Sequence, residues 1–432
     1  MPTIQDHPLR YQLANELHAR PFPSLRAPAR AVFLAIKKTH DAASRDRGED
    51  TAHLLDLLDR YGTQHPQPGA THFSAPIGQH VLKWEQHTEF VTYTVFLSGA
   101  GERPFDPADF DVFPGDWLAS APGVRVTSAM IRICERAADE EAVNTMINDW
   151  LVADSVAVSR VVDDAVVIAG DFRIDAGGHL RFGVFPRKGV GERRVGRVVQ
   201  RVCEIETYKA MSMLGFTRVR AIAPRMTEID AELTRLMTAM THGDAPEEET
   251  LRSLLRVSSE LETLSAQTAF RLSATAAYEA LVTSRISVLR EERFHGRQTF
   301  REFMVRRFDP AMRTVKSAER RLEAMSARAM RAGELLRTRV EVTRSAQNQE
   351  LLASMDRRAD MQLRLQHTVE GLSVVAISYY AVSLVGYLLY PLAGAVGMSK
   401  GLLTALAVPP VVLVVWLGLR RIRRSVTKEG GH

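Results

Sequence analysis

Two long uncharged runs near the end of the chain constrain its fold more than any other feature. Residues 371–392 read GLSVVAISYYAVSLVGYLLYPL, and residues 401–419 read GLLTALAVPPVVLVVWLGL. As helices that rise about 1.5 Å per residue, these runs would be about 33 Å and about 28 Å long. The hydrocarbon core of a bilayer is about 30 Å thick. We therefore predict two transmembrane helices, at 371–392 and 401–419, in preference to a hairpin buried in a soluble core.

The residues around the two runs predict their orientation. Only AGAVGMSK separates the runs, so we expect a tight antiparallel hairpin. Basic residues flank the hairpin on its outer side, whereas the connecting loop has Lys400 alone. The flanking residues are Arg357, Arg358 and Arg364 before it, and Arg420, Arg421, Arg423, Arg424 and Lys428 after it. Because basic residues favour the cytoplasmic side, both chain ends and the basic tail 420–432 are expected in the cytoplasm.

Composition limits the remaining possibilities. The first residues, MPTIQDHPLRYQLANELHARPFP, lack the basic and apolar regions of a secretory signal. The two cysteines, Cys134 and Cys203, form no metal-binding motif and indicate a reducing compartment. The net charge of +5 comes with Glu interleaved among the Arg, which is typical of solvated helix faces. We therefore expect no nucleic-acid partner and no structural zinc.

The N-terminal region, residues 1–195, mixes strand and helix patterns. Amphipathic helices are predicted at 49–62, where Gly62 ends the helix, and at 139–152. About seven runs alternate or are continuously apolar, as strands are: 29–36, 81–87, 89–97, 123–133, 155–162, 165–172 and 179–185. The pattern predicts an α+β or α/β domain built around one main sheet.

The following region, residues 196–370, reads as helical. We predict one helix that ends at Gly215, two more at 225–241 and 247–290, and a long one from about 311 to 366. In the long helix a seven-residue repeat, typical of a coiled coil, joins Val315, Leu322, Ala329 and Leu336. No residue ends that helix before the first apolar run, so we expect a stalk helix of about 80 residues, about 120 Å long, continuous with it. The prediction includes a homo-oligomer formed through the stalk and transmembrane helices.

Four other segments have residue types that can carry chemistry. LHARPFP places His18 and Arg20 beside two prolines, where they could hold an anion or transfer a proton, or simply form a helix exit. The Asp-rich segment 105–117 lacks the spacing of a calcium loop and suits helix capping better. Glu204 and Glu206 could act as an acid–base pair, although local ion pairing explains them too. GVGERRVGR at 189–197 fails the pattern of a phosphate-binding loop. No catalytic, cofactor-binding or metal-binding residue is predicted, and the residues indicate no particular cofactor.

Several segments resemble a known family: HPLRYQLANELHARPFP at 7–23, EIETYKAM at 204–211, SMDRRADMQLRLQ at 354–366 and TVEGLSVVAISYY at 368–380. Through them the chain resembles, over nearly its whole length, the bacterial family called domain of unknown function 3422. The resemblance implies a proteobacterial inner-membrane protein and supplies no site residues. In architecture alone, the chain is also similar to the CorA-type magnesium channels, in which a Gly-Met-Asn motif follows the first span.

Three functions agree with these features. The first is a non-enzymatic membrane protein whose large cytoplasmic domain senses, scaffolds or interacts. The second is a CorA-like oligomeric cation channel, with Gly397, Met398 and Ser399 in place of Gly-Met-Asn and with Ser378 and Tyr380 toward the pore. In it, Ser399 replaces the Asn that would orient hydrated cations. The third is an enzyme that uses His18 or the Asp-rich segment. The absence of recognised catalytic motifs favours the first.

Overall fold

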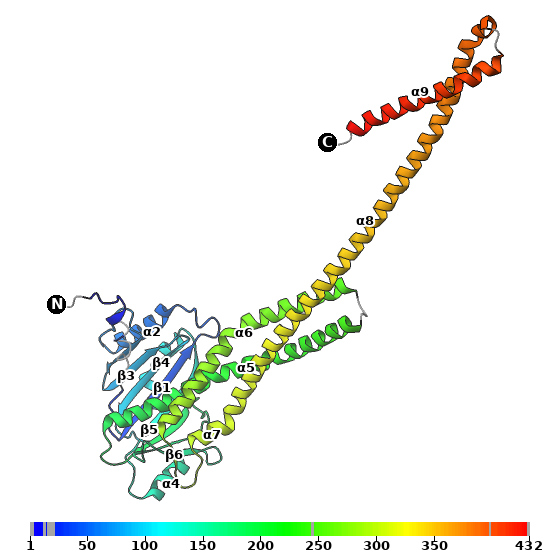
Figure 1. The fold of residues 1–432 in the computed structure, drawn as a ribbon. Coiled ribbons are helices and arrows are strands. Elements are labelled where there is room, and N and C mark those ends of the chain that lie inside the picture. Colours follow the sequence, from blue (N-terminus) through cyan, green and yellow to red (C-terminus); the bar gives the residue numbers. More distant parts are fainter. Residues whose placement is uncertain (1–3, 12–13, 15–21, 243–245, 397–398, 430–432) are drawn as a thin grey trace. The chain divides into compact units, whose positions relative to one another are not determined.

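The computed structural model describes residues 4–11, 14, 22–242, 246–396 and 399–429. Internal contacts divide the chain into two units, Met1–Gly333 and Glu334–His432. The first unit contains a mixed sheet and most of the long helices, and the second contains the apolar helices (Figure 1). This layout confirms the predicted class: an α+β N-terminal region, then long helices, then a C-terminal apolar region.

The sheet of the first unit has nine strands in the order β2-β3-β4-β1-β5-β8-β7-β6-β9. They are β1 (Ala29–Lys37), β2 (His72–Ile77), β3 (His80–Gln86), β4 (Phe90–Ser98), β5 (Val124–Ile133), β6 (Ala157–Val161), β7 (Val166–Gly170), β8 (Leu180–Pro186) and β9 (Glu292–Arg293). Among the described pairs, β5 and β8 alone are parallel. Every other pair is antiparallel.

The prediction of seven strands was too low, because it missed both edge strands. Strand β2 contains Pro76, which an edge strand tolerates but which hides the alternating pattern of a strand. Strand β9 has two residues and lies after helix α6 in sequence. It pairs with Ser159 and Arg160 of β6, a long-range contact that no local pattern could indicate.

One face of the sheet is covered by short helices. They are α2 (Arg47–Arg60), the 3-10 helix η1 (Pro107–Val112), α3 (Gly115–Ala119) and α4 (Glu140–Trp150). Leu54 and Leu58 of α2 pack with Trp84 of β3 and Trp117 of α3 in one core cluster. A second cluster joins α4 to β6, β7 and β8. Because successive side chains of a strand point to opposite faces, the remaining residues of each strand face the layer on the other side of the sheet.

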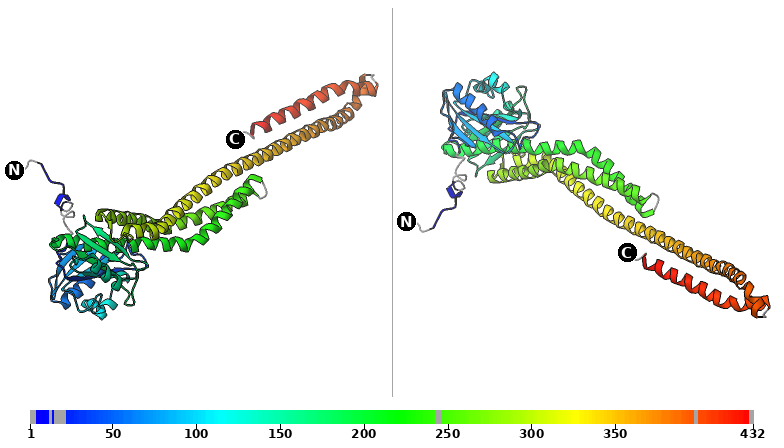
Figure 2. Two further views of the ribbon diagram at one scale, coloured as in Figure 1. Left: turned by 90° about the horizontal axis from the view of Figure 1, so that it is seen from below. Right: turned by 90° about the horizontal axis from the view of Figure 1, so that it is seen from above.

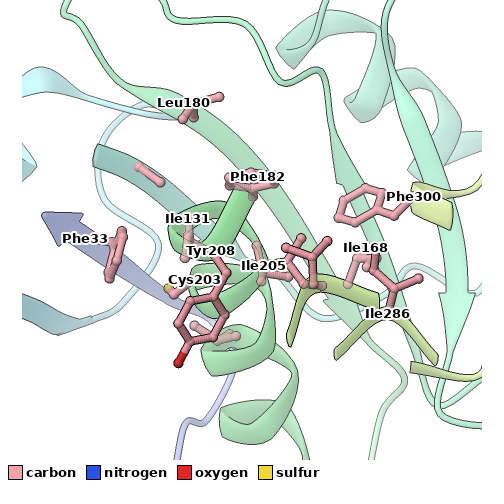
Figure 3. Packing of buried hydrophobic residues seen from close by; sticks show 14 of the residues in the cluster. Phe33, Ile131, Ile168, Leu180, Phe182, Cys203, Ile205, Tyr208, Ile286 and Phe300 are labelled. Carbon is pink, nitrogen blue, oxygen red and sulfur yellow. The ribbon is translucent and has the colours of Figure 1, made fainter. Parts of the chain in front are cut away.

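The opposite face is covered by two long antiparallel helices, α5 (Glu192–His242) and α6 (Glu247–Leu289), drawn side by side in green in Figure 2. The core beneath them contains Phe33 of β1, Ile131 of β5, Phe182 of β8 and Ile205 of α5 (Figure 3). Helix α7 (Phe300–Arg307) contributes Phe300 and Met304 to the same cluster. This layer produces the largest continuous core of the unit.

Helix α5 does not end at Gly215, contrary to the prediction. It continues through Gly215 and Pro224 to His242. An added Cβ at Gly215 would lie 2.1 Å from Oγ1 of Thr275 on α6, so the glycine permits close contact between the helices. Tertiary packing therefore explains a residue that the sequence alone presents as a helix stop.

Helix α8 (Asp309–Val396) is continuous, as predicted, from the helical region into the first apolar run. All four residues of the seven-residue repeat, from Val315 to Leu336, are buried. Helix α9 (Lys400–Glu429) follows and includes both Pro409 and Pro410. Two helices, Asp309–Leu389 and Gly401–Arg421, each contain a segment that is long and apolar enough to cross a membrane. Only 6% and 0% of the most apolar 18 residues of the two helices are buried, which distinguishes these helices from core helices.

Candidate functional site

A cavity of about 230 Å³ lies between the second face of the sheet and helices α5 and α6. Alternate residues of two strands form its floor: Lys83 and Glu85 from β3, and Thr92, Thr94 and Phe96 from β4. Strand alternation sends their neighbours, including Trp84 and Tyr93, into the core on the other face. The cavity floor is therefore polar, whereas the same two strands present large apolar side chains on their other face.

The floor of the cavity contains a buried ion pair. Lys83 is 6% exposed, and its Nζ lies 3.1 Å from Oε2 of Glu85. Beyond this ion pair, the ammonium has no hydrogen-bond acceptor among the described residues. Cys203 of α5 lines the same region, and burial raises the pKa of its thiol far above the ordinary value. The thiol is therefore protonated at neutral pH and is a poor nucleophile.

Helices α5 and α6 supply the charged wall. Gln200 donates from Nε2 to Oε1 of Glu204, at 2.9 Å, and Arg285 of α6 forms an ion pair with the other oxygen of Glu204. Oε1 of Gln200 is buried and has no partner among the described residues. Buried polar atoms without partners are uncommon in native proteins and indicate a water, ion or ligand.

Arg201 is the charged residue of this wall that lacks a counterion. The half-buried side chain makes no ion pair or hydrogen bond with the residues that the structure describes. Burial lowers the pKa of its guanidinium, and Arg197, Arg285 and Arg290 lower it further, whereas the nearby carboxylate of Glu204 raises it. An arginine stays protonated in proteins even so. Because Glu204 is already paired with Arg285, Arg201 leaves the cavity lining with one positive charge in excess.

Residues 22–25, at the end of the LHARPFP motif and just after it, lie on one side of the cavity. Phe22 lines the cavity, and the guanidinium of Arg197 lies 5.9 Å from the centre of its ring. The backbone N–H of Leu25 donates to the carbonyl oxygen of Glu192, at 3.2 Å. A Cβ at Gly196 would lie 1.7 Å from the carbonyl oxygen of Pro23, so glycine is required where this segment crosses α5. Phe22, from one segment that carries the family resemblance, and Glu204, from another, therefore both line the cavity.

The two glutamates that could have formed an acid–base pair are separated by the structure. Glu204 faces the cavity, whereas Glu206 accepts a hydrogen bond from Thr127 of β5, at 3.0 Å, and pairs with Lys209. Neighbours two apart on a helix do not share a face, which explains the separation. Glu206 is thus paired locally, with Lys209, whereas Glu204 is paired with Arg285 of α6 and not with a cation of its own helix.

The Asp-rich segment does not gather into a cation site. Asp106 caps η1 by accepting from the N–H of Ala108, and Asp109 lies 3.3 Å from Arg30. Asp116 pairs with Arg60 at 2.7 Å. No group of three His, Cys, Asp or Glu side chains that could hold a metal occurs among the described residues.

The remaining candidates lie in several places. His18 and Arg20, like Gly397 and Met398, fall outside the described residues. Ser399 lies between α8 and α9 and is exposed. Ser378 is 7% exposed, whereas Tyr380, two residues later, is 72% exposed. These two side chains are therefore in different environments on α8.

The cavity itself was not predicted from the sequence. A signal was present in VLKWEQH at 81–87, where Lys83 and Glu85 fall on one face of a predicted strand and Leu82 and Trp84 on the other. The position of Arg201 and Arg285 opposite that strand depends on how α5 and α6 cross the sheet, which periodicity does not indicate.

The family model described as a protein of unknown function, DUF3422, matches residues 5–426. The chain belongs to this family. The match confirms the resemblance seen in the four sequence segments. Neither the search of curated proteins nor that of solved structures found a match. The resemblance to CorA-type magnesium channels gains no support from these comparisons.

Proposed function

We propose that this member of the family is an integral protein of the bacterial inner membrane that senses a small ligand. In this proposal residues 371–392 and 401–419 cross the bilayer. The first 370 residues and the basic tail 420–432 lie in the cytoplasm. The domains are the α/β domain, residues 1–195, the helical region, residues 196–370, and the two spans. The sensing role is non-enzymatic.

The observation that carries the membrane assignment is the exposure of large apolar side chains on both helices. Tyr387 and Leu388 of α8 are 77% and 71% exposed, and Leu413 and Val414 of α9 are 57% and 67% exposed. A water-soluble protein rarely exposes a continuous apolar surface of this extent. A bilayer covers such a surface without any further protein partner.

The sensing role is supported by the chemistry of the cavity. Its two carboxylates are held in ion pairs with Lys83 and Arg285. Its cysteine is kept neutral by burial, which raises the pKa of the thiol. Groups held in this way bind and orient more readily than they transfer protons or attack, because catalysis needs an acid, base or nucleophile with a pKa near the working pH.

Membrane fractionation tests the anchor. We expect the full chain to stay in the membrane pellet after extraction with alkaline carbonate, whereas a chain without residues 371–432 becomes soluble. A chain that lacks only 422–432 is the control and should remain in the pellet, because both spans are intact. Recovery of the shortened chain 1–370 in the pellet, or release of the full chain by carbonate, would contradict the assignment.

We also propose that the protein forms a homo-oligomer through α8. Outside the first span, this helix exposes Leu351, Met355, Leu365 and Val369. These residues are spaced by 4, 10 and 4 positions, and Arg358 and Gln362 fill the gap at the same spacing of four and three, so all six lie along one side of the helix. The stripe continues into the span at Leu372, so a second copy of α8 could cover both regions without interruption. The partner in this proposal is another copy of the same chain.

A further inference from the structure

The charges around the cavity do not balance. Lys83 is paired with Glu85, and Arg285 with Glu204, which leaves the guanidinium of Arg201 as the unmatched charge among the described lining residues. A partly buried charge without a counterion is costly, and the cost is relieved when an anion binds beside it. The imbalance of one positive charge suits a ligand with one negative charge.

The cavity also has an apolar side. Phe33 and Phe96 from the sheet, Val199 from α5 and Val288 from α6 line it together with Phe22. The hydroxyl of Thr94 makes no hydrogen bond with the described residues and is available to a ligand. An inorganic anion would leave these apolar walls uncovered, whereas an organic acid would contact them and gain from their burial.

The size of the cavity restricts the ligand further. Its volume of about 230 Å³ is below the roughly 300–1,000 Å³ of sites for drug-sized molecules. This volume favours a metabolite-sized acid over a nucleotide. Aromatic and aliphatic side chains in the lining favour a body that is apolar and compact.

We propose that the cavity binds a small organic monocarboxylate, whose carboxylate pairs with Arg201 and whose apolar body lies against Phe33 and Phe96. The guanidinium provides two parallel N–H donors, the geometry in which arginine binds a carboxylate. This inference deepens the sensing role proposed above and rests on it. It names the class of ligand that the same cavity takes.

Binding is tested on the full chain purified in mild detergent, by calorimetry and by thermal unfolding. The probes are benzoate and hexanoate, compared with benzyl alcohol, benzylamine and inorganic phosphate. We expect saturable binding and a raised Tm with at least one of the two carboxylates. The neutral, cationic and inorganic compounds are expected to bind at least about tenfold more weakly, because they lack either the single negative charge or the apolar body.

A variant of Arg201 identifies the site. Arg201→Gln should weaken carboxylate binding by about tenfold or more, since a charged hydrogen-bonding partner is lost. Arg220→Gln is the matched control, because Arg220 is an exposed residue of the same helix. We expect it to bind as the unaltered chain does. The Tm of each variant without ligand shows that it is folded.

Three results would overturn the proposal. The first is that neither carboxylate binds. The second is that benzyl alcohol or phosphate binds as strongly as the carboxylates. The third is that a folded Arg201→Gln variant binds the carboxylates as the unaltered chain does. Each result concerns the ligand alone. Carbonate extraction decides the membrane assignment separately, so a failure of the ligand class is distinguishable from a failure of the anchor.

Discussion

At the scale of single residues, His53 shows how burial fixes a protonation state. Its Nε2 lies 3.0 Å from the carbonyl oxygen of Trp117, so this nitrogen must carry the proton. Its Nδ1 then accepts from the hydroxyl of Tyr93, also at 3.0 Å. The ring stacks on that of Trp117 with 3.9 Å between centroids. The neutral imidazole thus joins α2, α3 and β4.

Burial lowers the pKa of His53 below its ordinary value, and it also lowers the pKa values of His80 and His179. As pH falls below about 6.5, the unfolded chain therefore takes up protons that the folded chain does not. We expect the free energy of unfolding of the full chain to fall between about pH 7.5 and about pH 5.5. Urea unfolding at several pH values in this range measures it.

The variant His53→Gln separates this residue from the others. We expect it to be less stable at about pH 7.5, because stacking on Trp117 is lost, and to depend less on pH than the unaltered chain. His40→Gln, at an exposed position, is the control and should retain the full dependence. An unchanged dependence in His53→Gln would show that His53 does not contribute.

At the scale of elements, the crossing of α5 and α6 decides the shape of the helical layer. Gly215 faces Thr275, which is 1% exposed and donates to the carbonyl oxygen of Arg271 at 2.7 Å. A second link attaches α6 to the sheet, where Glu89 is held by Arg271 and accepts from the hydroxyl of Tyr278 at 3.0 Å. The helices and the sheet therefore lie in fixed positions around the cavity.

Gly215→Ala should destabilise the first unit by about 1–3 kcal/mol, because a methyl group meets Thr275 in a packed interface. Thr275→Ala creates space for that methyl group. We expect the double variant to be more stable than the sum of the single effects by about 1 kcal/mol, as measured by urea unfolding. Strict additivity would mean that the two residues do not compete for the same space.

Gly333→Ala provides the control for this prediction. A Cβ at Gly333 meets no atom within 4 Å, and the residue lies inside helix α8. Replacing a helical glycine by alanine in open space stabilises a protein by about 0.5–1 kcal/mol. The two glycines should therefore respond to the same substitution with opposite signs.

At the scale of the whole molecule, the apolar stripe of α8 predicts self-association. We expect the full chain in mild detergent to have the mass of an oligomer, measured by light scattering or native mass spectrometry. Met355→Glu combined with Leu365→Glu should reduce the oligomer, since charges would be buried in the contact. Ala353→Glu, on the opposite side of the helix, is the control. A monomeric unaltered chain would contradict the prediction.

The sequence by itself determined the features that depend on local composition. Two uncharged runs predicted the apolar helices, because span length follows from the thickness of the bilayer. The absence of a stop before residue 371 predicted the continuity of α8. Alternating or continuously apolar runs predicted seven of the strands and the α+β class, since each pattern spans only a few neighbouring residues.

The tertiary structure alone decided which faces meet. It extended α5 through Gly215, paired β9 with β6, and placed Arg201 and Arg285 over Lys83 and Glu85. These contacts join residues far apart in sequence, and their energies depend on packing that no local period encodes. The cavity is a product of that packing, whereas the apolar helices are evident from their composition.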